Sequence, residues 1–337
     1  MVSPFPKQLI RERVTSLIRQ YFNKGGFREI DTPTLIPSLP IEPNLYPLKT
    51  NWSYRQQELF LATSPESSLK KLISQGIGNC FTIAKVFRDL EDIGPTHNLE
   101  FSMLEWYEMG HDYYHLAKSV EKLINYIYVR IDKEKSKRTT NILTYQNQLI
   151  DLSPPWHRVT LQKLFLEYAG IDLAANLSLP SIIKTAAAKG YNVSGVTTWE
   201  PLYTQIFVNE IEPRLPTDKP VFIFDYPAAL SPLCQVCPKH PGFSQRFELY
   251  IGGMEIANGY TELTDAKTME SNFKAETEFR RQNRLPLHPY DQDLVQATTH
   301  FPSCTGIGLG VDRLAMLFAN TAHVDDVLYF PTSKMIS

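Results

Sequence analysis

Three glycines occupy every second position of the segment GIGLGVDRLAML, at Gly306, Gly308 and Gly310. Alternation is the period of a β-strand, whose side chains point to opposite faces in turn. Glycine weakens a strand interior and usually marks a place where another group approaches the backbone closely. The Asp312–Arg313 pair then opens an apolar run. The segment therefore predicts a strand with one bare face, followed at once by a helix that begins beside an arginine.

The rest of the chain predicts an α+β fold, in which helices surround an antiparallel sheet. Residues 7–22 and 64–75 are predicted helices, the second with Ser64 as its N-cap and Pro65 in its first turn. Residues 112–215 are expected to be mostly helical. Strands are expected within 27–38 and at 81–88, 99–107, 220–227, 246–253 and 254–260, with a polar helix over 265–284.

Composition places the chain among soluble globular proteins, since 43% of its 337 residues are apolar and 21% are charged. It has no apolar run long enough to span a membrane, and its first residues lack the apolar core of a signal peptide. Four cysteines favour a reducing compartment, so we expect a cytoplasmic protein without a membrane partner. The dinucleotide fingerprint, the P-loop and the kinase signature are absent, so a bound nucleotide would need another device.

The segment FELYIGGMEIANGYTEL (247–263) predicts a β-hairpin, because Gly252–Gly253 is typical of a two-residue turn. Such a turn pairs Glu248 with Ala257 and places Glu255 on the same face. Carboxylates that converge in a cleft repel one another unless a cation or a proton lies between them. A hard cation such as Mg²⁺, bound also by phosphate oxygens, suits this pair. The alternative is that both glutamates lie on a solvated sheet face.

A second hairpin is predicted over VFRDLEDIGPTHNLEFSMLEWY (86–107), where Arg88 ends the first strand. The guanidinium of arginine can bind a phosphate through two parallel hydrogen bonds. Glu105 and Tyr107 share a face of the second strand, and a buried glutamate requires a cationic or hydrogen-bonding partner. A phosphate site at Arg88 and a structural Arg–Glu pair are equally compatible with this pattern.

Two other sets of residues carry weaker signals. Cys234, Cys237 and His240 have part of the spacing of a zinc site, but a structural zinc needs four ligands. The chain has no second CxxC motif, so ordinary loop or core thiols are the favoured interpretation. His97 lies in the loop of the second hairpin, where it could contact a phosphate or face solvent.

Taken together, the motifs resemble a known family. The segments 27–38 (FREIDTPTLIPS), 86–108 (VFRDLEDIGPTHNLEFSMLEWYE) and 306–318 (GIGLGVDRLAMLF) are similar to motifs 1, 2 and 3 of class II aminoacyl-tRNA synthetases. The segments 63–72 (TSPESSLKKL) and 248–265 (ELYIGGMEIANGYTELTD) resemble lysyl-tRNA synthetases in particular. Because motif 1 begins almost at residue 1, with no anticodon-binding OB domain before it, the chain resembles the elongation factor P–lysine ligases.

This resemblance implies a class II synthetase catalytic fold as a single domain over residues 1–337, with a helical insertion at roughly 112–215. It implies an ATP-dependent ligase that uses Mg²⁺ to activate lysine or β-lysine as an adenylate and transfers it to a lysine side chain of elongation factor P. It also implies a cytoplasmic homodimer joined through motif 1, with no role for tRNA. Two alternatives remain: a free-standing lysyl-tRNA synthetase-like core that charges tRNA or another carrier, and a catalytically inactive dimeric regulatory paralog.

The resemblance also implies roles for individual residues. Arg88 and Arg313 are the implied catalytic arginines, at the α- and γ-phosphates. Glu248 and Glu255 are the implied Mg²⁺ ligands. The implied ATP site comprises Arg88, Asp89, Glu91, Asn98, Glu255, Ile256, Gly310 and Arg313, and the implied amino-acid site comprises Ser64, Pro65, Glu66, Tyr107, Asn258, Tyr260, Glu262 and Gly308.

Within the implied amino-acid site, Glu66 is near the α-amino group. Glu262 with Tyr107 meets the distal ammonium, since a buried ammonium needs an opposite charge. The motif 2 loop is one residue longer than is usual in the family, so either Asp89 or Glu91 takes the acidic role beside the adenine.

The implied role of the glycine strand is to form the floor of the amino-acid and adenine pockets, where any side chain would intrude. Gly308 matches the glycine of lysyl-tRNA synthetases, whereas the elongation factor P ligases have alanine there. This difference leaves open whether the substrate is lysine or β-lysine.

Overall fold

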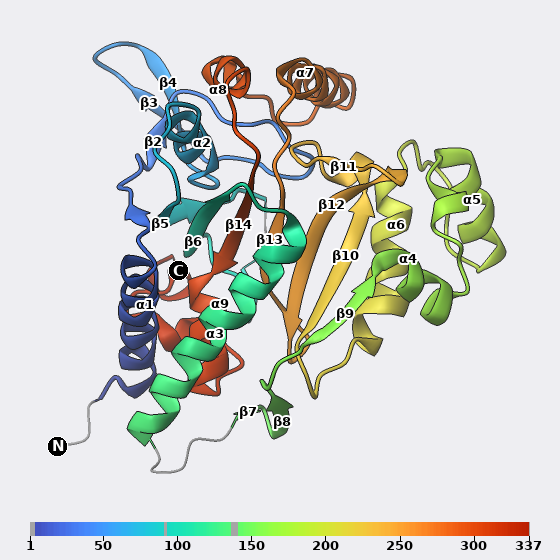
Figure 1. The fold of residues 1–337 in the computed structure, drawn as a ribbon. Helices are drawn as coiled ribbons and strands as arrows, with labels where there is room; N and C mark the ends of the chain where they lie inside the picture. The colour runs from blue at the N-terminus through green and yellow to red at the C-terminus, as the bar shows by residue number, and fades with distance from the viewer. Residues whose placement is uncertain (1–3, 91–92, 136–140, 337) are drawn as a thin grey trace.

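The fold is built on one large sheet, whose strands lie side by side across the molecule in Figure 1. In the computed structural model, which describes residues 4–90, 93–135 and 141–336, this sheet has nine strands. They are β1 (Arg28–Glu29), β5 (Cys80–Phe87), β6 (Glu100–Met109), β9 (His157–Thr160), β10 (Val221–Pro227), β11 (Val236–Cys237), β12 (His240–Ile251), β13 (Met254–Thr261) and β14 (Cys304–Gly310). Their order is β1-β5-β6-β14-β13-β12-β10-β9, with β11 beside β12. The pairs are antiparallel except β1–β5 and β10–β9, so the expected antiparallel α+β fold is confirmed.

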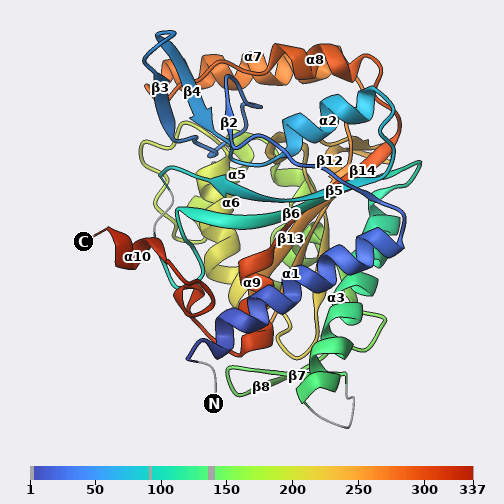
Figure 2. The same ribbon diagram turned by 90° about the vertical axis from the view of Figure 1, so that its left-hand side faces the viewer.

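Helices lie on both sides of the sheet (Figures 1 and 2). One layer comprises α1 (Pro6–Lys24), α3 (Tyr113–Lys135) and α9 (Val311–Ala319), and another group comprises α2 (Glu66–Ser74), α7 (Ala266–Gln282) and α8 (Gln292–Thr298). Helices α1, α3 and α9 pack on one another and on the strands, whereas α2 packs on α8 and α8 on α7. The short helix α10 (Thr332–Met335) follows near the end of the chain.

The main core lies between the sheet and the α1–α3–α9 layer. In β14, Ile307 and Leu309 point into this core, while the three glycines that alternate with them face the other way. Leu314 and Leu317 of α9 are fully buried in the same core, as the apolar run after Arg313 predicts. The expected strand-to-helix transition is confirmed at Gly310, and it fixes the first turn of α9 at the edge of the glycine face.

The segment at 112–215 contains strands that its sequence pattern does not predict. They are β7 (Ile142–Tyr145), β8 (Gln148–Asp151) and β9; the helices of the segment after α3 are α4 (Leu161–Leu164), α5 (Leu179–Ala188) and α6 (Glu200–Ile206), with short 3₁₀ and π turns between them. Strands β7 and β8 pair only with each other, whereas β9 joins the edge of the main sheet through β10. A separate core lies under α4, α5 and α6.

Two further details correct the expectations. A small sheet is formed by β2 (Leu35–Ile36), at the end of motif 1, with β4 (Gln57–Leu61) and β3 (Lys49–Trp52), which follow it. Helix α2 begins after Pro65, with no side-chain hydrogen bond at its N-cap, so the expected capping by Ser64 is wrong. No helix in the described ranges is both long and apolar enough to cross a membrane.

Asp291 anchors the α2–α8 contact, and its replacement is expected to destabilise the fold. It is 1% exposed, caps α8 by accepting a hydrogen bond from Leu294 N (3.1 Å), and pairs with Lys71 Nζ (2.6 Å). We expect Asp291→Ala to lower the free energy of unfolding by about 2–3 kcal/mol, since it removes a cap and leaves a cation unpaired. Urea unfolding tests this, with the exposed cap variant Asp265→Ala as the control; equal losses would contradict the prediction.

Candidate active site

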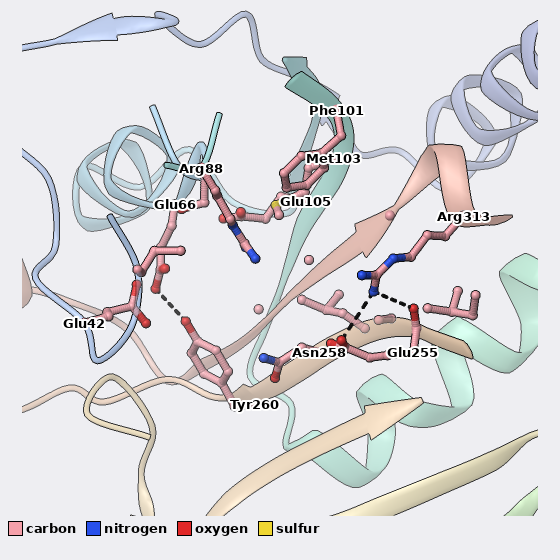
Figure 3. Close-up of a pocket in the computed structure, with 18 of the residues that line it drawn as sticks. Glu42, Glu66, Arg88, Phe101, Met103, Glu105, Glu255, Asn258, Tyr260 and Arg313 are labelled. Atoms are coloured by element: carbon pink, nitrogen blue, oxygen red, sulfur yellow. Dashed lines mark hydrogen bonds and ion pairs between the residues drawn. The ribbon is translucent and has the colours of Figure 1, made fainter. Parts of the chain in front are cut away.

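A cavity of about 410 Å³ lies over the bare face of the glycine strand (Figure 3). It is lined by β6, β13 and β14, the starts of α2 and α9, and loops at 42–45, 96–98 and 230–234. The sequence-derived residues that line it are Ser64, Glu66, Arg88, Asn98, Tyr107, Glu255, Ile256, Asn258, Tyr260, Gly308, Gly310 and Arg313. Pro65, Asp89, Glu248 and Glu262 do not line it, and Glu91 lies outside the described residues.

The glycines of β14 are not equally crowded. Gly306 lies opposite Tyr107 in β6, and a Cβ atom built on it would overlap that ring and the carboxylate of Glu262. A Cβ on Gly308 would come 3.3 Å from Sδ of Met103, and one on Gly310 no closer than 3.6 Å to other atoms. All three glycines line the cavity, but only Gly306 is closely surrounded by other protein atoms; that a side chain at any of them would intrude on bound substrates stays a prediction.

This difference predicts unequal effects for alanine substitutions along β14. Gly306→Ala is expected to lower the free energy of unfolding by about 1–3 kcal/mol, because its methyl group would overpack a buried site. Gly310→Ala, with ordinary contacts around its new methyl group, should lose much less. Urea unfolding measures both variants, and equal losses would show that the crowding at Gly306 is not what limits substitution.

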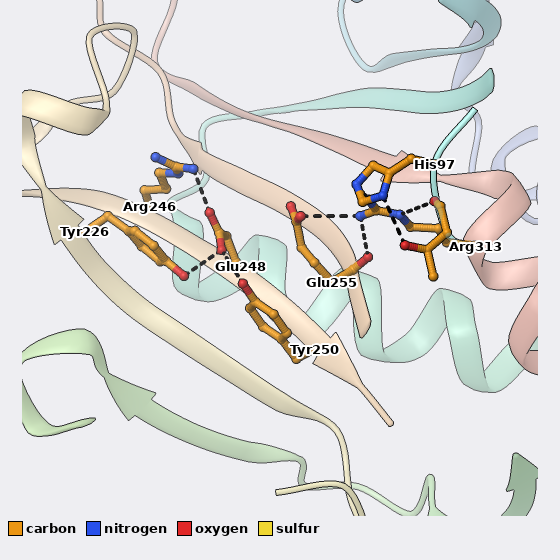
Figure 4. A network of polar contacts seen from close by, with 8 residues as sticks. His97, Tyr226, Arg246, Glu248, Tyr250, Glu255 and Arg313 are labelled. Atoms are coloured by element: carbon orange, nitrogen blue, oxygen red, sulfur yellow. Dashed lines mark hydrogen bonds and ion pairs between the residues drawn. The ribbon is translucent and has the colours of Figure 1, made fainter. Parts of the chain in front are cut away.

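Arg313 connects three parts of one end of the cavity (Figure 4). From the first turn of α9, its Nη1 donates to the carbonyl oxygen of Glu255 (2.9 Å) and pairs with the Glu255 carboxylate (3.3 Å). Its Nη2 lies 2.7 Å from Nε2 of His97, and its Nε donates to Thr96 O (3.3 Å). One guanidinium group therefore holds together the motif 2 loop, strand β13 and the motif 3 helix α9.

Arg88 lines the cavity between the Arg313 end and the opposite end, where Glu42, Glu66 and Glu105 lie (Figure 3). Its guanidinium carbon lies 5.3 Å from the centre of the Phe101 ring, within cation–π range. Asp89, the next residue, turns away: its carboxylate accepts a hydrogen bond from Leu90 N (2.9 Å). This position does not bring Asp89 to the cavity, whereas Arg88 lies where a phosphate could bind.

Asn98 lines the cavity, but its side chain is already engaged by the backbone. Its Nδ2 donates to Glu100 O (2.6 Å), and its Oδ1 accepts from Thr332 N (3.2 Å). Asn98 therefore fixes the end of the motif 2 loop against the C-terminal segment.

Behind the wall of the opposite, acidic end of the cavity lies a buried lysine that the sequence pattern does not reveal. Lys70 of α2 is 1% exposed, and its ammonium lies between the carboxylates of Glu66 and Glu262, 2.6 Å from Oε2 of Glu262. Burial alone lowers the pKa of Lys70, but the two carboxylates raise it above its ordinary value. Tyr260 donates a hydrogen bond to Oε1 of Glu66 (2.5 Å). Glu262, expected to meet a substrate ammonium, is paired with an ammonium of the chain itself.

Two further glutamates face the cavity at this end and were not among the predicted site residues. Tyr107 donates a hydrogen bond to Oε1 of Glu105 (2.7 Å), so this buried glutamate has the hydrogen-bonding partner that its burial requires. Burial, together with the nearby Glu66, raises the pKa of Glu105 well above its ordinary value. The same two causes raise the pKa of Glu42 to about 7. The alternation of β6 could have indicated Glu105; no sequence signal indicated Glu42.

The hairpin carrying Glu248 and Glu255 forms with the expected two-residue turn, since Gly252 and Gly253 both have positive φ. The expected pairing of Glu248 with Ala257 is wrong, because a β-bulge shifts the register and places Glu248 opposite Asn258. The two glutamates still lie along one side of the hairpin (Figure 4).

The two glutamates of the hairpin have different surroundings. Glu248 is held by Arg246 (2.7 Å), Tyr226 (2.7 Å) and Tyr250 (3.0 Å). Burial raises its pKa, Arg246 lowers it, and the neighbouring Glu255 raises it. Glu255 is 39% exposed at its side chain. Two neighbouring carboxylates, one of them accessible, have the oxygen-donor chemistry that Mg²⁺ prefers.

The cysteine loop is not a metal centre in this structure. Cys234 and Cys237 are free and buried, and burial raises the pKa of each thiol. In the part of the chain that the structure describes, these cysteines and His240 do not form a group of potential metal ligands. Cys234 lines the cavity, so the loop contributes to the pocket wall.

Comparison with known proteins identifies the family. Residues 7–334 match the family model described as tRNA synthetases class II (D, K and N). The chain belongs to this family. The class II synthetase fold expected from the three motifs is thereby confirmed, and so, at the level of the family, is an ATP-dependent amino-acid ligase.

Curated relatives of this class II synthetase have two kinds of name. A lysine–tRNA ligase from Moorella thermoacetica is 31% identical over 337 residues, covering 99% of this chain and 67% of the relative. An elongation factor P–(R)-β-lysine ligase from Yersinia enterocolitica is 32% identical over 340 residues, covering 98% of this chain and 97% of the relative. The chain thus spans about two thirds of the lysine–tRNA ligase and nearly the whole of the elongation factor P ligase. Similarity to both kinds supports a lysine ligase, without choosing between their acceptors.

Proposed function

We propose that the protein activates lysine or β-lysine with ATP and transfers it to a lysine side chain of elongation factor P. The observation that carries this proposal is the opposite charge at the two ends of one cavity. Glu42, Glu66 and Glu105 line one end, and Arg313 lines the other, with Arg88 between them. An amino acid with two ammonium groups suits the acidic end, and the phosphates of a nucleoside triphosphate suit the arginines.

Lys70 neutralises only part of the acidic end, so carboxylates remain for a substrate with two ammonium groups. Its ammonium is placed to neutralise Glu66 and Glu262, whereas Glu105 and Glu42 remain in the cavity wall. Glu105, oriented by Tyr107, is therefore our candidate for the distal ammonium in place of Glu262. Glu66, which Tyr260 also contacts, retains the implied role at the α-amino group.

In this mechanism the chain's residues act by position and charge. Arg88 and Arg313 would donate to phosphate oxygens as the substrate carboxylate attacks the α-phosphorus and pyrophosphate leaves. The neutral amine of the acceptor lysine then attacks the carbonyl carbon of the adenylate, and AMP leaves. Glu248 and Glu255 would hold Mg²⁺, which when bound neutralises charge on the phosphates. No covalent protein nucleophile is required.

The metal assignment predicts a strong effect of removing one carboxylate charge. Glu255→Gln is expected to lower ATP–pyrophosphate exchange at least about a hundredfold, since one charged ligand is lost while the side chain keeps its size. Because the Glu255 side chain is 39% exposed, circular dichroism and thermal unfolding should change little. Exchange at the wild-type rate would refute the assignment. Glu278→Gln, on the exposed face of α7, is the matched control.

The acceptor is tested separately from the activation step. Purified protein is incubated with ATP and each amino acid, and exchange is followed without tRNA; no exchange with any amino acid would refute the ligase proposal. We expect exchange with lysine or β-lysine and transfer of the labelled amino acid to elongation factor P. Transfer to tRNA alone would instead establish the lysyl-tRNA synthetase-like alternative, which the glycine at position 308 and the lysine–tRNA ligase relatives favour. A homodimer remains a prediction, tested by light scattering.

A further inference from the structure

A second group of possible metal ligands lies away from the cavity, at the corner where β6 leads into α3 (Figure 1). Glu108 is near the end of β6, His111 lies in the turn, and His115 is in the first part of α3. One ligand atom from each of these side chains lies within 4.8 Å of the other two. Within residues 4–90, 93–135 and 141–336, this is the one group of three His, Cys, Asp or Glu side chains so placed. The mechanism above does not use any of the three.

Glu108 is oriented as a metal ligand would be. Glu108 is 7% exposed, and each of its two carboxylate oxygens accepts a hydrogen bond from a different side chain. Oε1 accepts a hydrogen bond from Trp106 Nε1 (3.0 Å), while Oε2 accepts from Ser119 Oγ (3.0 Å) and lies 3.1 Å from Nε2 of His115. Hydrogen bonds of this kind orient ligating carboxylates and are part of most metal sites.

The two histidines are also brought together by the local backbone. Gly110, with a φ of +72°, turns the chain after β6, and Asp112 accepts a hydrogen bond from His115 N (2.9 Å) in the first turn of α3. The imidazole rings of His111 and His115 stack with centres 3.6 Å apart and planes 3° apart. The stack places both imidazoles beside Glu108, and imidazole nitrogens are common ligands of transition-metal ions.

The spacing of the group suits a tetrahedral zinc ion. Ligand atoms about 2.0–2.1 Å from Zn²⁺ lie about 3.3 Å from one another in tetrahedral geometry. The Glu108–His115 pair, at 3.1 Å, is already close to this separation. A bound ion lies close to the plane of each imidazole, so the two parallel rings would unstack on binding, and the exposed His111 is the ring that would rotate. Two imidazoles and one carboxylate leave a fourth position for water.

We propose that Glu108, His111 and His115 form a binding site for a divalent transition-metal ion of the zinc type. The ion would join the end of β6 to the start of α3. Hard cations such as Mg²⁺ are poor competitors there, because they prefer all-oxygen ligands. The proposal does not rest on the activity of the cavity, which lies on the opposite face of β6.

The test uses tag-free, full-length protein treated with a chelator and titrated with ZnCl₂ in excess Mg²⁺, which occupies oxygen-only sites. We expect calorimetry to give one Zn²⁺ per chain, and Zn²⁺ to raise the melting temperature. A Co²⁺-substituted sample should show the visible absorption of a four- or five-coordinate ion.

Variants assign the binding to the three residues. His111→Ala and His115→Ala should each weaken Zn²⁺ binding at least about tenfold, and Glu108→Gln should do so while keeping the Trp106 contact. His300→Ala, at an exposed histidine elsewhere, should bind as the wild type does. No stoichiometric binding by the wild type, or unchanged binding by a His111→Ala/His115→Ala double variant that keeps the wild-type circular dichroism spectrum, would overturn the proposal.

Discussion

Replacing Lys70 by methionine is expected to lower the free energy of unfolding by about 3–5 kcal/mol. Methionine fits the volume of the lysine side chain, so the expected loss is electrostatic. In the wild type, the Lys70 ammonium pairs with the carboxylates of Glu66 and Glu262, and all three side chains are at least nine-tenths buried. Removing the ammonium leaves two carboxylates close together without a counter-ion, an arrangement that is strongly unfavourable in a protein interior.

The loss should depend on pH in a defined direction. Burial raises the pKa of Glu262 from an ordinary 4.5 to about 8, and removing Lys70, which lowers this pKa, raises it further. A carboxyl group with a higher pKa in the folded state binds a proton that the unfolded chain has released. Between about pH 4.5 and 8 the folded forms of both proteins hold this proton and gain stability together as the pH falls, so the deficit of the variant should change little there. Above about pH 8 the folded wild type releases the proton and the variant keeps it, so the deficit should be larger at about pH 9.5 than at about pH 7.

Urea unfolding followed by circular dichroism at the two pH values measures this prediction. The double variant Lys70→Met/Glu262→Gln should recover part of the loss, since it removes one of the two stranded charges. Lys274→Met, in an exposed pair with Glu270, is the matched control and should change stability little. A Lys70→Met variant no less stable than this control, or one whose deficit grows at low pH, would contradict the electrostatic explanation.

The sequence predicts those parts of the site that depend on local patterns. Alternating glycines before an arginine predict the bare strand and the helix start, and Gly252–Gly253 predicts the hairpin turn; both are present. These features follow from the two-residue period of strands and from the few residue types that adopt positive φ. The register of the same hairpin is less predictable, because a bulge of one residue moves Glu248 from Ala257 to Asn258 without a clear signal in the residues themselves.

The acidic end of the cavity shows why the other residues of the site could not be predicted from the sequence. A lysine four residues after a glutamate, as in Glu66 and Lys70, is typical of an exposed helical ion pair. In the fold, however, Lys70 is buried and has a second partner, Glu262, which is distant in the sequence. The order of strands in the sheet brings Glu262, at the end of β13, beside α2. Glu42 likewise reaches the cavity from a loop whose path the local sequence does not specify. Long-range placement, not residue type, decides which carboxylates meet a substrate.

Replacing Arg313 by alanine is expected to lower the rate of ATP–pyrophosphate exchange about a thousandfold, given the proposed activity. The substitution removes a cation at the phosphate end and releases four groups at once: the carbonyl oxygen and the carboxylate of Glu255, His97 Nε2 and Thr96 O. Stability should change far less, because the Arg313 side chain is 22% exposed and the apolar face of α9 is unaffected. Arg281→Ala, on the exposed part of α7, is the control.

A lysine at the same position separates charge from geometry. Arg313→Lys keeps the positive charge, but a single ammonium on a flexible chain cannot reproduce the planar guanidinium that contacts Glu255 and His97 together. We therefore expect Arg313→Lys to recover only part of the activity, with a weaker apparent affinity for ATP than the wild type. Full recovery would show that charge alone is needed, and that the contacts to the motif 2 loop do not position the phosphates. Exchange by Arg313→Ala at the wild-type rate would remove Arg313 from the nucleotide site altogether.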